Sequence, residues 1–157
     1  MDSADYRIRP ATLADADALA HHRIAMFTDM GVPLDAEALG RAFRAWLGHV
    51  MADGSYQAWL VEHRTDGIVA GGGMTVIPWP PGPRYLGDRL AFVYNVYTEP
   101  AHRGQGLARL VMAAIHEWCR AHGISSLALN ASTFGKPLYD SLGYAVTPSP
   151  MMFFALD

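Results

Sequence analysis

The segment that decides the fold is Val96–Trp118, VYTEPAHRGQGLARLVMAAIHEW. It begins as the end of an apolar strand, breaks at Pro100, crosses an Arg-Gly-Gln-Gly loop and continues as an amphipathic helix. A glycine loop at a helix start presents backbone N–H groups and the positive end of the helix dipole, which together can hold an anion. We therefore expect this loop to bind the pyrophosphate of a cofactor and the rest of the chain to build a reaction site around it.

Composition sets the class of protein. The chain has 157 residues, of which 51% are hydrophobic and 17% charged, which predicts a single globular domain over 1–157 with a sizeable core. A net charge of −3 without a long basic run argues against nucleic acid as a partner. No apolar run is long enough to cross a bilayer, so no membrane partner is expected. The single cysteine, Cys119, is expected to be a buried structural thiol and suits a reducing, cytoplasmic location.

Hydrophobic periodicity before the loop predicts a strand at 6–9, a helix from Thr12 to about Met30, a second helix after an Asp35 N-cap, and strands at 56–63 and 68–77. Thr12 and Asp15 fit a capping box. The core stripe expected for the first helix is Leu13, Ala16, Ala20, Ile24 and Phe27. Three glycines at 71–73 indicate a bulge or a close approach by another backbone or a ligand.

The remaining segments predict a strand at 90–98, the helix after the loop, a strand at 124–130, a short helix and two last strands at 144–146 and 151–156. Pro137 in the first turn and Gly143 beyond the end mark the short helix. This order of elements predicts a mixed α/β layer structure.

The sequence of the loop limits the classes of ligand that it can bind. Arg103, Gly106 and Ala108 fit the pattern R/Q-x-x-G-x-G/A, in which small residues let the backbone close round a diphosphate. A dinucleotide fingerprint is excluded because Arg109 stands where its third glycine would be. A nucleoside triphosphate loop is excluded because no Gly-Lys-Ser/Thr follows.

Three stretches between Leu90 and Tyr144 share a further pattern: VYTEPAHRGQGLARL, LALNAS and GKPLYDSLGY. Together with the opening RIRPAT, they resemble the GCN5-related N-acetyltransferases (GNAT family). The resemblance implies a central, mostly antiparallel sheet of six to seven strands, splayed at strands 4 and 5 and flanked by four helices. It also implies transfer of an acetyl group from the co-substrate acetyl-CoA to an amine.

The same resemblance implies where the cofactor binds. The pantetheine arm would run beside the strand before the loop, the loop would wrap the pyrophosphate, and further contacts would come from the segment after the next strand. The expected cofactor-binding residues are Val96, Tyr97, Thr98, Arg103, Gly104, Gln105, Gly106, Leu107, Ala108, Arg109, Asn130 and Lys136. Tyr139 matches the tyrosine that protonates the departing thiolate in many members.

Acetyl transfer to an amine needs a base, an oxyanion donor and an acid. The attacking amine must be neutral, and a phenol with a reference pKa near 10 can protonate the thiolate. A backbone N–H near Val96 could stabilise the oxyanion. Glu99 is the expected base, while His21, His22 and Asp29 remain alternatives, acting directly or through water. Adjacent histidines do not share a helix face, so no metal site is expected.

The acceptor is expected to be a primary amine on a small molecule. On the first helix, residues opposite the core stripe would be either a solvated face or one covered by the second helix or a substrate. The stretch at 78–83 would be a stiff connector or a wall of the acceptor site. The candidate acceptor contacts are His22, Met26, Asp29, Met30, Trp79 and Asn95. A protein or peptide acetyltransferase and a non-catalytic CoA-binding module are the alternatives, and exposed apolar faces make a homodimer plausible.

Overall fold

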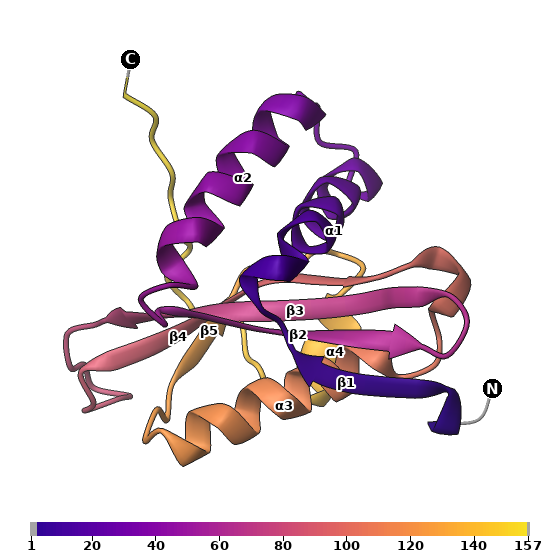
Figure 1. The fold of residues 1–157 in the computed structure, drawn as a ribbon. Coiled ribbons are helices and arrows are strands. Elements are labelled where there is room, and N and C mark those ends of the chain that lie inside the picture. Colours follow the sequence, from indigo (N-terminus) through magenta and orange to yellow (C-terminus); the bar gives the residue numbers. More distant parts are fainter. Residues whose placement is uncertain (1–2, 157) are drawn as a thin grey trace.

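A computed structural model describes residues 3–156, and Figure 1 shows their arrangement in layers. A five-stranded sheet lies between helices on both of its faces. Helices α1 (Ala16–Asp29) and α2 (Ala36–Val50) cover one face, and α3 (Leu107–Ala121) covers the other. The short α4 (Lys136–Ser141) packs beside β5 against the same core as α3. The expected α/β layers with four helices are therefore confirmed for the described part of the chain.

The sheet has the order β1-β2-β3-β4-β5. Its strands are β1 (Tyr6–Pro10), β2 (Tyr56–His63), β3 (Gly67–Pro78), β4 (Arg89–Thr98) and β5 (Leu127–Leu129). Neighbours pair antiparallel except β4 and β5, which pair in parallel along Ala91–Val93. β5 ends at Leu129, the partner of Val93, so the rest of β4 has no strand beside it on the β5 side.

A β-bulge lies in β4 beside the glycine run of β3. Between the pairs Gly73–Tyr94 and Gly71–Tyr97, two residues of β4 oppose one residue of β3. Asn95, the first of the two, has a φ of 62°, the one positive φ of a non-glycine residue among residues 3–156. The extra residue shifts the alternation of side chains, so Tyr94, Asn95 and Tyr97 all lie on the face that α1 covers.

Each face of the sheet has its own core. On the α3 face, Val111, Met112 and Ile115 are fully buried against the strands. Cys119 is buried there too, with its Sγ 3.4 Å from the Sδ of Met74. Its expected burial is confirmed, and burial raises the pKa of this thiol to about 11, which disfavours the thiolate that a nucleophile needs. The other core joins α1 and α2 to β2.

The first helix departs from expectation at its start. Leu13–Asp15 forms a 3-10 turn, and α1 begins only at Ala16. The backbone N–H of Thr12 donates to the Asp15 carboxylate at 2.8 Å, as a capping box requires. Leu13 is 49% exposed rather than in the core, because the irregular turn changes the phase of the helix that follows.

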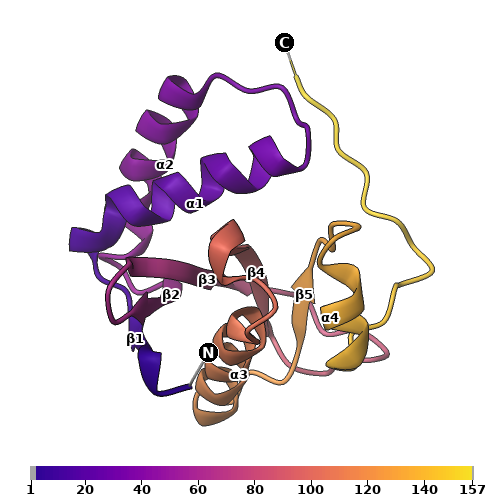
Figure 2. The ribbon, with the colours of Figure 1, turned by 90° about the vertical axis from the view of Figure 1, so that its right-hand side faces the viewer.

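The two last strands expected at 144–146 and 151–156 do not form, so the described residues contain five strands rather than six to seven. β5 has only three residues to pair with, and Pro148 and Pro150 lack the N–H groups that a ladder needs. Figure 2 shows the C-terminal segment running away from β5 toward the connection between α1 and α2. None of the described helices is long and apolar enough to span a membrane.

Candidate active site

The glycine loop joins the end of β4 to the start of α3. A short 3-10 turn at Pro100–His102 follows the strand, and Gly106 is the N-cap of the helix. Gly104 and Gly106 have φ values of 77° and 78°, a conformation that strains any other residue. Leu107 is buried and anchors the helix start. The loop thus presents free helix N–H groups, as an anion site requires.

Arg103 connects this loop to three other segments. Its Nε donates to the carbonyl oxygen of Thr98 at 3.0 Å, and its guanidinium pairs with Asp29 at 2.6 Å. The same guanidinium lies 5.7 Å from the centre of the Tyr97 ring and 5.8 Å from that of Phe134. Asp29, an expected acceptor contact, therefore binds the loop arginine at the end of α1.

Glu99 lies directly after β4 and faces α1. Its Oε1 accepts a hydrogen bond from Nε2 of His21 at 2.6 Å, and the Tyr97 hydroxyl lies 3.5 Å from its other oxygen. The carboxylate is mostly shielded from solvent, whereas the His21 side chain is mostly exposed. Two of the candidate bases thus form one hydrogen-bonded pair, through which a proton could pass to solvent.

His22 points into the protein rather than outward. It is 1% exposed, its ring packs 5.3 Å from the Tyr97 ring, and its Nδ1 has no hydrogen-bond partner among the described residues. A Cβ at Gly71 would lie 3.2 Å from this nitrogen, so Gly71 leaves room for a side chain of α1, whereas the sequence pattern predicted a bulge or an approach by a backbone or a ligand. Burial, helped by the charge of His21, lowers the pKa of His22 to about 4, so its ring is neutral at physiological pH.

Asn95 holds the bulge against α1. Its Nδ2 donates to the carbonyl oxygen of Leu19 at 3.0 Å, while its Oδ1 has no hydrogen-bond partner among residues 3–156. The residue is 3% exposed. A buried carbonyl oxygen without a donor is costly, so this atom marks a place where a ligand or water can bind.

Tyr139 lies in α4, next to the open side of β4 and β5. Its ring packs against the α3-face core and meets the Tyr144 ring edge to face at 5.9 Å. Burial raises the pKa of the Tyr139 phenol, which keeps it protonated at neutral pH. Arg109 of α3 ties this helix in place through a 2.7 Å hydrogen bond to Ser141.

The structure places the other expected contacts less centrally. Met26 is partly buried, Met30 is half-exposed, and Gln105, Asn130 and Lys136 are on the surface. Lys136 pairs with Asp140 at 2.7 Å.

Trp79, half-exposed, follows β3 at the end where Pro78 pairs with Arg89. Because β4 has 10 residues, Trp79 lies roughly 30 Å along the strand from Glu99. The structure therefore does not bring it to the cluster around Tyr97.

The sequence did not indicate a second group of residues, which surrounds a cavity of about 360 Å³ between α1, α2 and the sheet. Its lining is Arg23, Leu39, Ala42, Phe43, Trp46, Tyr56 and Tyr94. Another cavity, of about 730 Å³, lies between the end of α3 and β5, far from the glycine loop along the helix. Only the smaller cavity borders the bulge of β4, through Tyr94.

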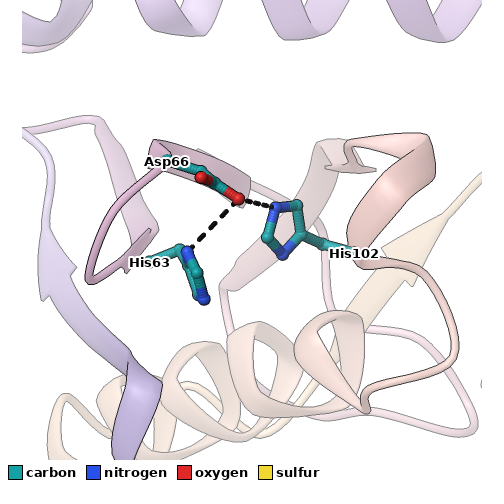
Figure 3. Close-up of side chains that lie close together, drawn as sticks. All are labelled: His63, Asp66 and His102. Atoms are coloured by element: carbon teal, nitrogen blue, oxygen red, sulfur yellow. Dashed lines mark hydrogen bonds and ion pairs between the residues drawn. The ribbon is translucent and has the colours of Figure 1, made fainter. Parts of the chain in front are cut away.

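A third group contains possible metal ligands. Figure 3 shows Asp66 between the rings of His63 and His102, and one ligand atom of each lies within 4.8 Å of the others. Asp66 contacts His63 at 3.3 Å and His102 at 2.9 Å. The Tyr6 hydroxyl lies 2.9 Å from the other ring nitrogen of His102. These side chains could hold a metal, and their hydrogen bonds also tie the β2–β3 turn to the start of the glycine loop.

A sheet whose β4 extends beyond β5, followed by a glycine loop at a helix start, is the arrangement expected of an acyltransferase. The sequence pattern of the acetyltransferase (GNAT) family matches residues 17–144, and the chain belongs to that family. No curated protein matches the chain.

Solved structures agree with this assignment. A GCN5-related N-acetyltransferase from Ralstonia eutropha JMP134 is 33% identical with a TM-score of 0.85, covering 95% of this chain and 98% of its own. A predicted acetyltransferase from Clostridium acetobutylicum, solved with acetyl-CoA, is 23% identical with a TM-score of 0.87. The match covers 95% of this chain and 96% of the other chain. Glucosamine-6-phosphate N-acetyltransferase from Arabidopsis thaliana is 17% identical with a TM-score of 0.70. This match covers 95% of this chain and 97% of the other chain.

Proposed function

We propose that this acetyltransferase moves an acetyl group from acetyl-CoA to the primary amine of a small molecule. The observation that carries the proposal is the glycine loop at the start of α3, which follows the end of β4 that has no partner on the β5 side. Gly104 and Gly106 both adopt the left-handed conformation there. The Arg103 side chain donates a hydrogen bond to the carbonyl oxygen of Thr98 at the end of β4. A diphosphate would bind the loop, while the pantetheine arm would extend along Val96–Thr98.

In the proposed reaction the amine nitrogen attacks the thioester carbon, a C–N bond forms and the C–S bond breaks. A backbone N–H near Val96 would stabilise the oxyanion. Glu99, hydrogen-bonded to His21 at 2.6 Å, would take the proton that the amine loses. Tyr139 would give a proton to the departing thiolate, since the raised pKa of its phenol keeps that proton available at neutral pH.

A small acceptor is favoured over a peptide by the space beside the bulge. The cavity that borders Tyr94 has a volume of about 360 Å³, near the lower end of the roughly 300–1,000 Å³ typical of ligand sites. It is bounded by two helices and the sheet, which suits a metabolite rather than an extended peptide.

The test is an acceptor screen with acetyl-CoA, read as release of free thiol. We expect Tyr139→Phe to lower kcat by about 10²- to 10⁴-fold, as removal of a general acid does. Tyr85→Phe is the matched control, since Tyr85 bonds to the carbonyl oxygen of Arg89 at the far end of β4. Full activity of Tyr139→Phe across the pH range would refute the acid role. A thermal shift with acetyl-CoA but no turnover with any amine would point instead to a CoA-binding module.

A further inference from the structure

The cavity between α1 and α2 holds a cation without an acidic partner. Arg23 lines it, and no carboxylate among residues 3–156 forms an ion pair with the Arg23 guanidinium. The guanidinium lies between two rings instead, 5.1 Å from the centre of Phe27 and 5.2 Å from that of Phe43. Partial burial lowers the pKa of Arg23, but a guanidinium remains charged throughout the physiological range.

An unpaired, partly buried cation costs stability unless a ligand pairs with it. Asp17 does not pair with Arg23, because its carboxylate binds Arg44 at 2.7 Å on the surface. Nearby Glu37 binds Arg41, also at 2.7 Å. Each arginine of α2 thus has an acidic partner, whereas the N–H donors of Arg23 remain available to a ligand.

A second polar group lines the same cavity. Tyr56 is 2% exposed, and its hydroxyl has no hydrogen-bond partner within the described chain. Tyr94 lines the cavity as well. The two phenols and the guanidinium thus line one cavity. A guanidinium and phenol hydroxyls are donors that suit a carboxylate.

The remaining walls are apolar. Phe43 and Trp46 stack at 5.5 Å, and Leu39 and Ala42 complete the α2 side. A ligand that fits must therefore combine an anionic group with an apolar or aromatic body.

We infer that the acceptor is an amine that also carries a carboxylate, of the class of apolar and aromatic amino acids, and that Arg23 binds the carboxylate. This inference rests on the proposed function and names the acceptor class. The same charge disfavours polyamines and other polycationic acceptors. The position is suitable for the reaction, because Tyr94 directly precedes the bulge and the amine would extend from the cavity toward Val96–Thr98.

The experiment measures binding rather than turnover. Calorimetry with the CoA-loaded protein compares each amino acid with the amine that lacks its carboxylate: phenylalanine with phenethylamine, tryptophan with tryptamine, and leucine with 3-methylbutylamine. We expect at least one amino acid to bind ten-fold or more tighter than its amine, and Arg23→Gln to abolish that preference. Arg41→Gln, on the exposed side of α2 with its own partner Glu37, is the matched control and should retain it.

The outcomes separate the two proposals. Amines that bind as well as their amino acids, a preference that survives in Arg23→Gln, or no binding of any probe would overturn the acceptor class. Thiol release in the same samples tests acetyl transfer independently. If tryptamine is acetylated as well as tryptophan, the acetyltransferase proposal holds while the carboxylate inference fails.

Discussion

The buried His22 should make the protein less stable in mild acid. Burial lowers the pKa of its imidazole to about 4, from 6.5 in an unfolded chain. Between these two pH values the imidazole is protonated in the unfolded state but not in the folded state. The free energy of unfolding therefore falls as the pH falls from about 6.5 to about 4. Above this window the imidazole is neutral in both states, and its titration has no effect.

The size of the effect follows from the two pKa values. At pH 7 the linkage is nearly zero, whereas at pH 5 it removes about 2 kcal/mol from the free energy of unfolding. His22 is 1% exposed, so solvent screening reduces this figure little. Replacement by Gln removes the titrating group. His22→Gln should therefore lose about 2 kcal/mol less than the natural protein between pH 7 and pH 5.

Urea unfolding at the two pH values measures the difference, followed by circular dichroism and fitted with a two-state model. His22→Gln changes packing against Tyr97, so the comparison uses each variant's own pH dependence rather than its absolute stability. His49→Gln, at an exposed position near the end of α2, is the control and should keep the natural slope. Parallel pH profiles for the natural protein and His22→Gln would refute the reasoning.

Three further substitutions, one of them with a control in α2, probe the site. Asn95→Ala should cost about 1–3 kcal/mol in urea unfolding, because alanine lacks the hydrogen bond to α1 and disfavours a positive φ. Gly72→Ala should lower the free energy of unfolding by about 1–3 kcal/mol, because the new Cβ would lie 2.9 Å from Val111. Gly48→Ala in α2 is the control. Its Cβ would meet nothing within 4 Å, so this change should raise the free energy of unfolding by about 0.5–1 kcal/mol. Arg103→Gln should weaken acetyl-CoA binding in calorimetry while changing Tm little, because its ion pair is partly exposed; unchanged affinity would remove Arg103 from the cofactor site.

Local signals predicted the parts of the site that local chemistry determines. Gly104 and Gly106 specify a left-handed loop whatever surrounds them, and Asp35 caps α2 as expected through its hydrogen bond from the N–H of Ala38 at 3.0 Å. The strand at 56–63 matches β2 in both of its bounds. These features depend on a few neighbouring residues, which the sequence displays directly.

The inward face of α1 depended on contacts that the sequence does not display. His22 is buried because α1 starts after a 3-10 turn and because Gly71, far away in the chain, leaves space above the sheet. Arg23 lines a cavity whose other walls come from α2 and the sheet, segments far from it in the sequence. The C-terminal apolar run has the composition of a strand, but the β5 edge offers only three residues, and the run forms no strand in the described part of the chain.

The bulge at Asn95 explains why the candidate site lies where α1 crosses β4. In a regular strand, Tyr94 and Tyr97 would point to opposite faces of the sheet. The additional residue brings both to the α1 face, Tyr94 at the cavity with Arg23 and Tyr97 beside Glu99 and Arg103. One strand thus serves the proposed acceptor cavity and the glycine loop from the same side. Deleting Asn95 would leave Val96 alone opposite Gly72, so Tyr97 would keep its partner Gly71 and its face, while the hydrogen bond to Leu19 of α1 would be lost.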